Sequence, residues 1–395
     1  MRKYHFVSIL SLILLMKFVP LQGQNQYDDD IEPAVEDIWV WLPFIGDKPF
    51  AVVANHTSMM GKTHLVDTLV NMNYNLKKIF SPEHGFRGKA DAGAYLYNSE
   101  DTVTGLPVIS LYGHNKKPKP RQLEDVEIVL FDIQDVGARF YTYLSTLTLV
   151  MEACAENDVT LLILDRPNPN GFYVDGPILE PRYESFVGMH PIPIVHGMTA
   201  VEYANMVNSE GWISEKCDLI WMLAENYTHD KYYKLPVKPS PNLPDMASVY
   251  LYPSLCLFEG TTVSVGRGTP NPFSIYGHPD LDYGKYSFIP QPGEGSQHPK
   301  LQGKRCYGED LSDYGQNFQS KPHQINLEWL IKAYHSLKDE GKFFNDYFDK
   351  LAGTSRLREQ IQAGLTEKQI RELWEDDLEE FRKLRKKYLL YPESE

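Results

Sequence analysis

Residues 126–165 read "VEIVLFDIQDVGARFYTYLSTLTLVMEACAENDVTLLILD", and this stretch decides the fold class. It begins and ends with continuous apolar runs, at 126–133 and 159–165, and a longer stretch of helical character separates them. Strands that are apolar at successive positions are typical of a parallel sheet covered on both faces, because both sets of side chains are then buried. The stretch therefore predicts a strand, a helix and a second strand parallel to the first.

The same alternation continues on both sides of this unit. Further apolar strands are predicted at 50–55, 76–81, 107–112 and 217–224. One helix is predicted at 61–73, and another begins after Thr199, which forms a capping box with Glu202. No GxGxxG follows the first strand, so the layout does not indicate a dinucleotide site. The pattern predicts an α/β fold with a mostly parallel sheet.

The second half of the chain has a different character. Residues 235–325 are rich in Pro, Gly, Tyr and Asn, which predicts long ordered loops with a few strands. From residue 326 the pattern is helical, with a second capping box from Thr366 to Gln369. One apolar stripe near the end comprises Trp374, Leu378, Phe381 and Tyr388. We therefore divide the chain into an α/β subdomain at 24–235 and a smaller α+β subdomain at 236–395, after a leader at 1–23.

The leader has the layout of a secretory signal peptide. It has a basic start at Arg2 and Lys3, an apolar stretch at 6–15 and a small residue at its end. The apolar stretch is short for a membrane span, and Lys17 follows it closely, which disfavours the alternative of an uncleaved anchor. We expect an exported protein that is not inserted in a membrane after signal cleavage.

Composition excludes several classes of function. The formal net charge of −14 leaves little capacity to neutralise phosphates, so nucleic acid is not an expected partner. The four cysteines, Cys154, Cys217, Cys256 and Cys306, are not at the spacing of a zinc ribbon. One or two disulfides remain open, although the apolar neighbours of Cys154 and Cys256 predict buried thiols there.

Polar and ionisable residues follow almost every predicted strand, where parallel sheets bind their ligands. These residues are Asn55, Glu83, His84, Arg87, Asp135, Arg139, Tyr141, Asp165, Arg166, Asn168 and His196. Glu83 is distinctive, because Pro82 and Gly85 constrain the backbone around it and a turn needs no glutamate. We predict a catalytic role for Glu83, whereas His84 either orients it, binds substrate or forms a structural hydrogen bond. Asp165 is equally compatible with a turn, and Asp132, inside an apolar run, is better explained as structural.

Carboxylates beside arginines and tyrosines suit glycoside cleavage. That reaction needs a carboxylic acid to protonate the leaving oxygen, and a second carboxylate or an internal nucleophile opposite it. Partial burial raises the pKa of a glutamate toward the range that an acid catalyst requires. The sequence lacks GxSxG and GxxxxGK[ST], and its histidines form no HExxH pair, so we expect neither a cofactor nor a metal.

Several motifs resemble one known family. They are "FSPEHGFRG", "DIQDVGARFYTY", "LDRPNPNG", "DGP", "HGMT", "PSPNLP" and "EGTTVSVGRGTPNPF". Their order over residues 37–391 is similar to that in the NamZ-type exo-β-N-acetylmuramidases. The resemblance implies a Rossmann-like α/β subdomain, a smaller second subdomain and an active site in the cleft between them. It also implies a periplasmic enzyme that releases N-acetylmuramic acid from the non-reducing end of peptidoglycan fragments of the MurNAc-GlcNAc type, with Glu83 as the leading acid or base and His84 beside it.

This substrate adds two expectations. Its lactyl carboxylate requires a cation, for which Arg87, Arg139, Arg166 and Arg267 are the candidates. We favour Arg139 because Tyr141 and Tyr143 follow it closely. The second catalytic group is Asp135, Asp165, Glu259 or the acetamido group of the substrate. The alternatives are a non-catalytic periplasmic protein that binds muropeptides or sugars, and a metal-dependent hydrolase of the peptide part.

Overall fold

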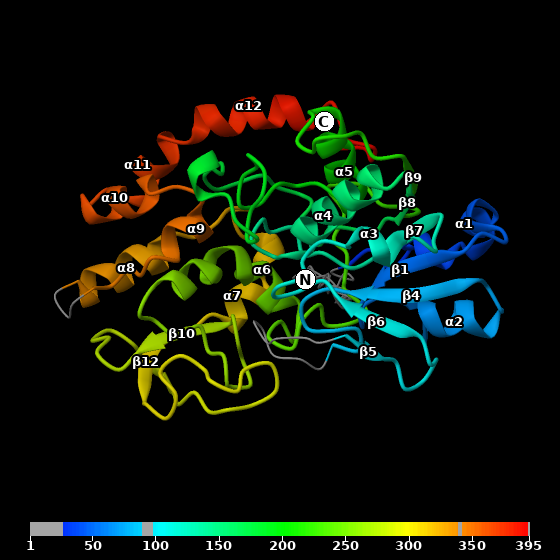
Figure 1. Cartoon of the computed structure of the whole chain (residues 1–395). Helices are drawn as coiled ribbons and strands as arrows, with labels where there is room; N and C mark the ends of the chain where they lie inside the picture. Colours follow the sequence, from blue (N-terminus) through cyan, green and yellow to red (C-terminus); the bar gives the residue numbers. More distant parts are fainter. Residues whose placement is uncertain (1–26, 89–97, 339–341, 394–395) are drawn as a thin grey trace, which may run out of the picture.

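The structure is a computed structural model that describes residues 27–88, 98–338 and 342–393 (Figure 1). The predicted signal peptide at 1–23 lies outside the described residues. Within the described part, no helix is both long and apolar enough to cross a membrane.

A seven-stranded sheet forms the first half of the chain, in the order β5-β6-β4-β1-β7-β8-β9. Only β5, at one edge, runs antiparallel to its neighbour among these seven strands. The strands are β1 (Phe50–Ala54), β4 (Leu76–Ser81), β5 (Ser99–Glu100), β6 (Pro107–Ser110), β7 (Ile128–Asp132), β8 (Thr160–Leu164) and β9 (Leu219–Met222). In the central strand β1, Val52 pairs with Ile79 on one side and with Leu130 on the other. The predicted mostly parallel sheet is confirmed.

Helices cover both faces of this sheet, which explains why the central strands β1, β7 and β8 are almost entirely apolar and buried. α1 (Ile38–Ile45) and α2 (Leu65–Asn71) pack on the face that carries Val52 and Leu130. α4 (Tyr143–Glu156) and α5 (Ala200–Ser209) pack on the opposite face. The predicted capping box at the start of α5 is present. Shorter elements of this half are η1 (Ala34–Glu36), β2 (Met59–Met60), β3 (Thr63–His64), α3 (Pro120–Leu123) and η2 (Pro181–Tyr183).

The second half combines a small antiparallel sheet with helices, as its composition predicts. The sheet has the order β10-β12-β11, with β10 (Ile275–His278), β11 (Tyr286–Phe288) and β12 (Cys306–Asp310). The helices are α6 (Met246–Leu255), η3 (Cys256–Gly260), α7 (Ser312–Gln316), η4 (Phe318–Ser320), α8 (Glu328–Leu337), α9 (Phe348–Ala352), α10 (Arg356–Gln362), α11 (Glu367–Glu372) and α12 (Glu375–Arg385). The capping box at Thr366 is confirmed, and Trp374, Leu378 and Phe381 of the apolar stripe are buried.

The end of the chain returns to the first half. Figure 1 shows α12 running back over the molecule, so that the C-terminus lies near α5. The backbone N–H of His229 donates to the carbonyl of Pro392, with an N–O distance of 2.9 Å. All four cysteines are buried and free, which confirms the buried thiols at Cys154 and Cys256 and shows no disulfide.

Candidate active site

A cavity of about 1040 Å³ lies between the two halves of the chain. One wall comes from the loops that follow β4, β6 and β7, and it includes Glu83, His84, Tyr112, Lys116 and Tyr141. The other wall comes from the second half and includes Asn242, Tyr252, Glu259, Arg267 and Tyr347. The cavity therefore lies where parallel sheets bind ligands, beyond the carboxyl ends of the strands.

Glu83 is held in a tight turn directly after β4. The N–H of Gly85 donates to the carbonyl of Pro82 at 3.1 Å, and both His84 and Gly85 are left-handed, with φ of 69° and 78°. A left-handed histidine is uncommon, and such conformations concentrate at functional sites. This turn explains why the strand ends in Pro-Glu-His-Gly: it directs Glu83 into the cavity.

Hydroxyl groups surround the Glu83 carboxylate. Thr142 donates from Oγ1 to Glu83 Oε2 at 2.9 Å, and the Tyr112 hydroxyl also hydrogen-bonds to Glu83. Thr142 is the N-cap residue of α4, so the positive end of that helix faces the carboxylate. Burial raises the pKa of Tyr112 and Tyr143, and the charge of Glu83 raises it further. Both phenols therefore remain protonated donors at neutral pH.

The segment around Ser240 closes the cavity next to His84. His84 Nε2 lies 3.3 Å from Ser240 Oγ, and the Tyr141 hydroxyl donates to the Pro239 carbonyl at 2.7 Å. His56 Nε2 contacts the Lys238 carbonyl at 2.8 Å. These contacts fasten the segment from the second half to the first half of the chain.

Glu259 and Arg267 form a closed ion pair on the opposite wall. Arg267 donates from Nε to Glu259 Oε1 at 3.0 Å and from Nη2 to Oε2 at 2.9 Å. Burial alone would raise the pKa of Glu259, but Arg267 outweighs it and the pKa is lowered. Glu259 is therefore an ionised wall residue whose two oxygens are both engaged, which makes it a poor proton donor.

Among the predicted site residues, the cavity brings together Glu83, His84, Tyr141, Glu259 and Arg267. The other predicted arginines do not line it. Arg87 pairs with Asp67 and Asp101, at 2.9 and 2.8 Å. Arg166 forms a buried pair with Asp132, with an Nε–Oδ1 distance of 2.6 Å, which confirms the structural interpretation of Asp132. Both guanidinium groups are therefore engaged in ion pairs with carboxylates and are not available to bind a substrate.

Arg139, which we favoured as the lactyl-binding cation, is also outside the cavity lining. Its guanidinium donates to four backbone carbonyls, those of Pro177, Ile192, Leu351 and Ala352, at distances of 2.7 to 3.0 Å. The side chain is only 2% exposed. Arg139 therefore joins the two halves of the chain through its two terminal nitrogens, and its remaining donor, Nε, is buried outside the cavity lining.

Asn55 and His196 are buried and Asp135 is half-buried, and none of the three lines the cavity. Asp135 Oδ1 accepts from the N–H of Gly137 at 2.7 Å, and burial raises the pKa of this carboxyl to about 7. Asn55 Oδ1 accepts from the N–H and hydroxyl of Thr57, at 2.9 and 2.6 Å. Burial lowers the pKa of His196 to about 3, and its Nδ1 accepts from the N–H of Met198. These three side chains organise the strand ends.

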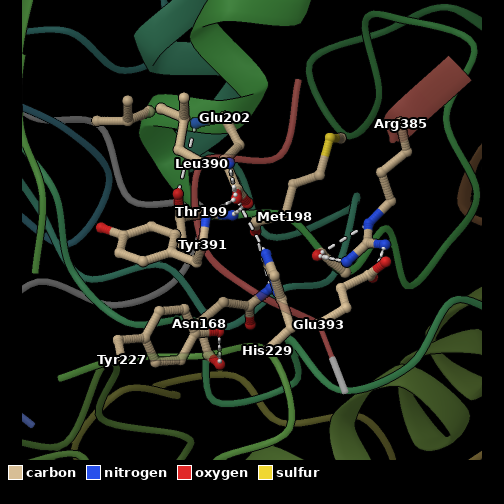
Figure 2. A network of polar contacts seen from close by, with 12 residues as sticks. Asn168, Met198, Thr199, Glu202, Tyr227, His229, Arg385, Leu390, Tyr391 and Glu393 are labelled. Carbon is tan, nitrogen blue, oxygen red and sulfur yellow. Dashed lines mark hydrogen bonds and ion pairs between the residues drawn. The ribbon is translucent and has the colours of Figure 1, made fainter. Parts of the chain in front are cut away.

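Asn168 lies in a separate polar network near the C-terminus (Figure 2), and Asp165 is joined to it through Tyr391. The Tyr391 hydroxyl donates to Asp165 Oδ2 at 2.7 Å, and Asn168 Nδ2 donates to the Met198 carbonyl at 2.8 Å. Nearby, Glu202 Oε1 accepts from the N–H of Leu390 at 2.8 Å and lies 3.0 Å from His229 Nε2. This placement favours a structural role for Asp165 over a catalytic one, although its side-chain partners, Val201 and Tyr391, are distant in the sequence and are not those of a local turn.

Asp165 provides a pH-dependent test of this network. Burial raises its pKa from 3.8 to about 7, so the folded state retains a proton that the unfolded state loses. Stability from this group is present below pH 4 and declines as the pH rises to about 7. Asp165→Asn mimics the protonated acid, so we expect the variant to gain stability relative to wild type between pH 5 and pH 8. Urea unfolding of both proteins at the two pH values measures the difference, and a pH-independent difference would contradict the assignment.

Sequence reasoning missed several residues of the cavity. Tyr112 is the last residue of the strand predicted at 107–112, and this position at the carboxyl end of a parallel strand could have identified it as a site residue. Lys116, Phe186, Gln297, His298, Tyr347 and Lys350 lie in loops or on a short helix, without a periodic pattern that marks them. Across the described ranges, no group of three or more His, Cys, Asp or Glu side chains is arranged to hold a metal ion.

Comparisons with known proteins agree over most of the chain. Residues 50–247 match the family model of exo-β-N-acetylmuramidase NamZ, N-terminal, and residues 250–391 match exo-β-N-acetylmuramidase NamZ, C-terminal. The chain is 41% identical over 346 residues to peptidoglycan β-N-acetylmuramidase NamZ of Bacillus subtilis (strain 168), a match that covers 81% of each protein.

Two solved structures of DUF1343 family proteins from Bacteroides fragilis NCTC 9343 are also similar. One is 46% identical, has a TM-score of 0.86, and the match covers 92% of this chain and 100% of the other. The second is 26% identical, has a TM-score of 0.76, and the match covers 92% and 99%. These structures agree with the α/β fold and its smaller second part.

Proposed function

Since the chain belongs to the NamZ family of exo-β-N-acetylmuramidases, we propose that it releases N-acetylmuramic acid from peptidoglycan fragments in the cavity around Glu83. The resemblance in its motifs is thereby confirmed, and the chain is a glycosidase that acts on peptidoglycan. Membership of an enzyme family disfavours both the non-catalytic sugar-binding protein and the metal-dependent hydrolase of the peptide part. The finer proposals concern the catalytic groups, the saccharide and the location.

The observation that carries the catalytic assignment is the contrast between the two carboxylates of the cavity. Within the described lining, Glu83 and Glu259 are the only carboxylates. Arg267 engages both oxygens of Glu259, whereas the contacts of Glu83 include the hydroxyls of Thr142 and Tyr112. Hydroxyl donors orient a carboxylate without neutralising it, so Glu83 is able to exchange a proton with the glycosidic oxygen.

The second catalytic function then comes from the substrate. Asp135 and Asp165 do not line the cavity, and Glu259 is engaged, so the acetamido group is the remaining candidate of those predicted. In such a mechanism the acetamido oxygen attacks the anomeric carbon while Glu83 protonates the leaving oxygen. Water then opens the cyclic intermediate, and Glu83 accepts its proton. Tyr112, Phe186 and Tyr347, which are half-buried or exposed in the lining, supply aromatic surface against which a sugar can pack.

Hydrolysis of matched chromogenic glycosides tests the proposed function. We expect the mature protein to cleave an aryl β-N-acetylmuramide and to leave the β-N-acetylglucosaminide essentially intact. A disaccharide of the MurNAc-GlcNAc type should release free N-acetylmuramic acid, and a longer glycan should shorten from its non-reducing end. Cleavage inside the glycan, or no cleavage by a folded protein, would contradict the proposal.

We also propose that residues 1–23 direct export and that the mature enzyme acts in the periplasm. The basic start and short apolar stretch of the leader support this, as does a substrate that lies outside the cytoplasmic membrane. The same muramide assay on periplasmic and cytoplasmic fractions tests the location. Activity confined to the cytoplasmic fraction would argue against export.

A further inference from the structure

Two of the lysine and arginine side chains that line the cavity are not neutralised by an ion pair with a described carboxylate. Its described lining includes Lys116, Arg267 and Lys350 as cationic side chains, and Glu259 neutralises Arg267. No carboxylate in the described part of the chain lies within ion-pair distance of Lys116 or Lys350. In a protein with a net charge of −14, a cation left uncompensated inside a cavity points to an anionic ligand.

Lys116 is connected to Glu83 by one continuous aromatic wall. The Tyr112 hydroxyl bonds to Glu83, the rings of Tyr112 and Phe186 have centroids 6.0 Å apart, and Lys116 Nζ lies 4.5 Å from the Phe186 centroid. A sugar whose anomeric carbon is at Glu83 can lie along this wall. Its substituent at O3 would then extend toward the ammonium group.

The wall is held in place before any ligand binds. Ser185 and Gly188 exchange backbone hydrogen bonds of 2.9 and 3.0 Å, which makes a tight turn that presents Phe186. A side chain at Gly188 would have its Cβ 3.2 Å from Arg139 Cδ, so the turn packs closely on that buried arginine. Phe186 in turn restrains the stem of Lys116 through the cation–π contact, which lowers the entropy lost on binding.

Lys350 is a weaker candidate for the same role. It is exposed and lies close enough to Asp346 to influence that carboxylate. A fully hydrated, mobile ammonium contributes little to binding, whereas a partly desolvated one contributes more. Lys116 is half-buried.

We propose that Lys116 binds the lactyl carboxylate of N-acetylmuramic acid and so makes the cavity selective for this sugar over N-acetylglucosamine. The inference deepens the proposed function and rests on it. It replaces the arginine expected from the sequence with a lysine from the loop after β6. Lys116 is a binding residue in this assignment, with no part in proton transfer.

Three lysine variants test this inference. Lys116→Met removes the charge, Lys117→Met is the matched control in the same loop, and Lys350→Met tests the rival cation. Lys117 does not line the cavity and is paired with Glu152 and Glu156, at 3.1 and 2.7 Å. We expect Lys116→Met to lower kcat/KM on the muramide about 10- to 100-fold, mainly through KM, because a charged contact of the bound sugar is lost. Lys117→Met should remain at the wild-type value.

A neutral substrate separates charge recognition from general damage. On the muramide whose lactyl group is a primary amide, wild type and Lys116→Met should have the same kcat/KM. An equal loss on both substrates, or loss of selectivity in Lys350→Met with Lys116→Met unchanged, would overturn the assignment.

Calorimetric titration with free N-acetylmuramic acid measures binding without cleavage, so it tests the role of Lys116 independently of the proposed enzymatic activity. Binding that Lys116→Met weakens at least tenfold would support the inference even if wild type cleaved no muramide. Equal binding by wild type and Lys116→Met would overturn it even if wild type were active.

Discussion

Glu83→Gln should lower kcat on an aryl β-N-acetylmuramide by about 10²- to 10⁴-fold, because the amide cannot transfer a proton to the leaving oxygen. Glutamine has nearly the same shape and can still accept from Thr142 and Tyr112, whose hydroxyls surround the native side chain. The fold should therefore persist, and circular dichroism and the thermal midpoint provide the control. Residual activity within tenfold of wild type would remove Glu83 from the chemistry.

The leaving group distinguishes an acid from a nucleophile at this position. If Glu83 protonates the leaving oxygen, Glu83→Gln should lose least on a dinitrophenyl muramide, whose leaving group needs no proton, and most on the natural disaccharide. A loss of the same size on both substrates would instead indicate a nucleophile. In that case the acetamido group would no longer be required as the internal nucleophile.

The fold was readable from the sequence because its strands are buried on both faces. Phe50–Ala54 and Leu76–Ser81 agree with the predicted strands to within a residue. Phe50–Ala54 is apolar at every position, as expected of a strand covered on both faces, whereas Leu76–Ser81 includes two lysines that are only half-buried. The antiparallel edge strand Ser99–Glu100 was not predicted, because it is exposed and lacks an apolar pattern. The 366–391 region contains two helices, α11 and α12, with a break before Glu375 that its charge pattern does not reveal.

The site was only partly predictable, and the reason differs for each residue. Glu83 is identifiable because its turn is formed by neighbouring residues, so Pro82 and Gly85 indicate that turn in the sequence itself. An arginine is harder to interpret, because its role depends on distant partners. The carbonyls that Arg139 binds belong to residues up to 213 positions away, and the carboxylate that Arg166 binds is 34 positions away. Sequence proximity to Tyr141 and Tyr143 carried no information about these partners, and the contacts of Arg139 disfavour it as the lactyl-binding cation.

Arg139 nevertheless controls the cavity indirectly. Its carbonyl partners Pro177 and Ile192 flank the segment that carries Phe186, and Leu351 and Ala352 end the short helix α9, which carries Lys350. Gly353, with φ of 78°, lies so close that a Cβ would be 2.6 Å from Arg139 Nη2. One guanidinium therefore sets the position of two cavity walls that are far apart in the sequence.

Arg139→Met should destabilise the protein by about 3 to 5 kcal/mol, because four buried carbonyls would lose a charged donor that no solvent can replace. Arg139→Lys should recover only part of this loss, since an ammonium cannot reproduce the planar arrangement of donors. Urea unfolding measures the change, with Arg182→Met as the control. Arg182 is on the same segment, but its side chain is 62% exposed, so its removal should leave the midpoint unchanged. If Arg139→Met unfolded at the wild-type midpoint, the four contacts would contribute nothing net to stability. If Arg139→Met were destabilised but kept the wild-type KM for the muramide, the two cavity walls would keep their positions without Arg139, which would contradict its role in positioning them.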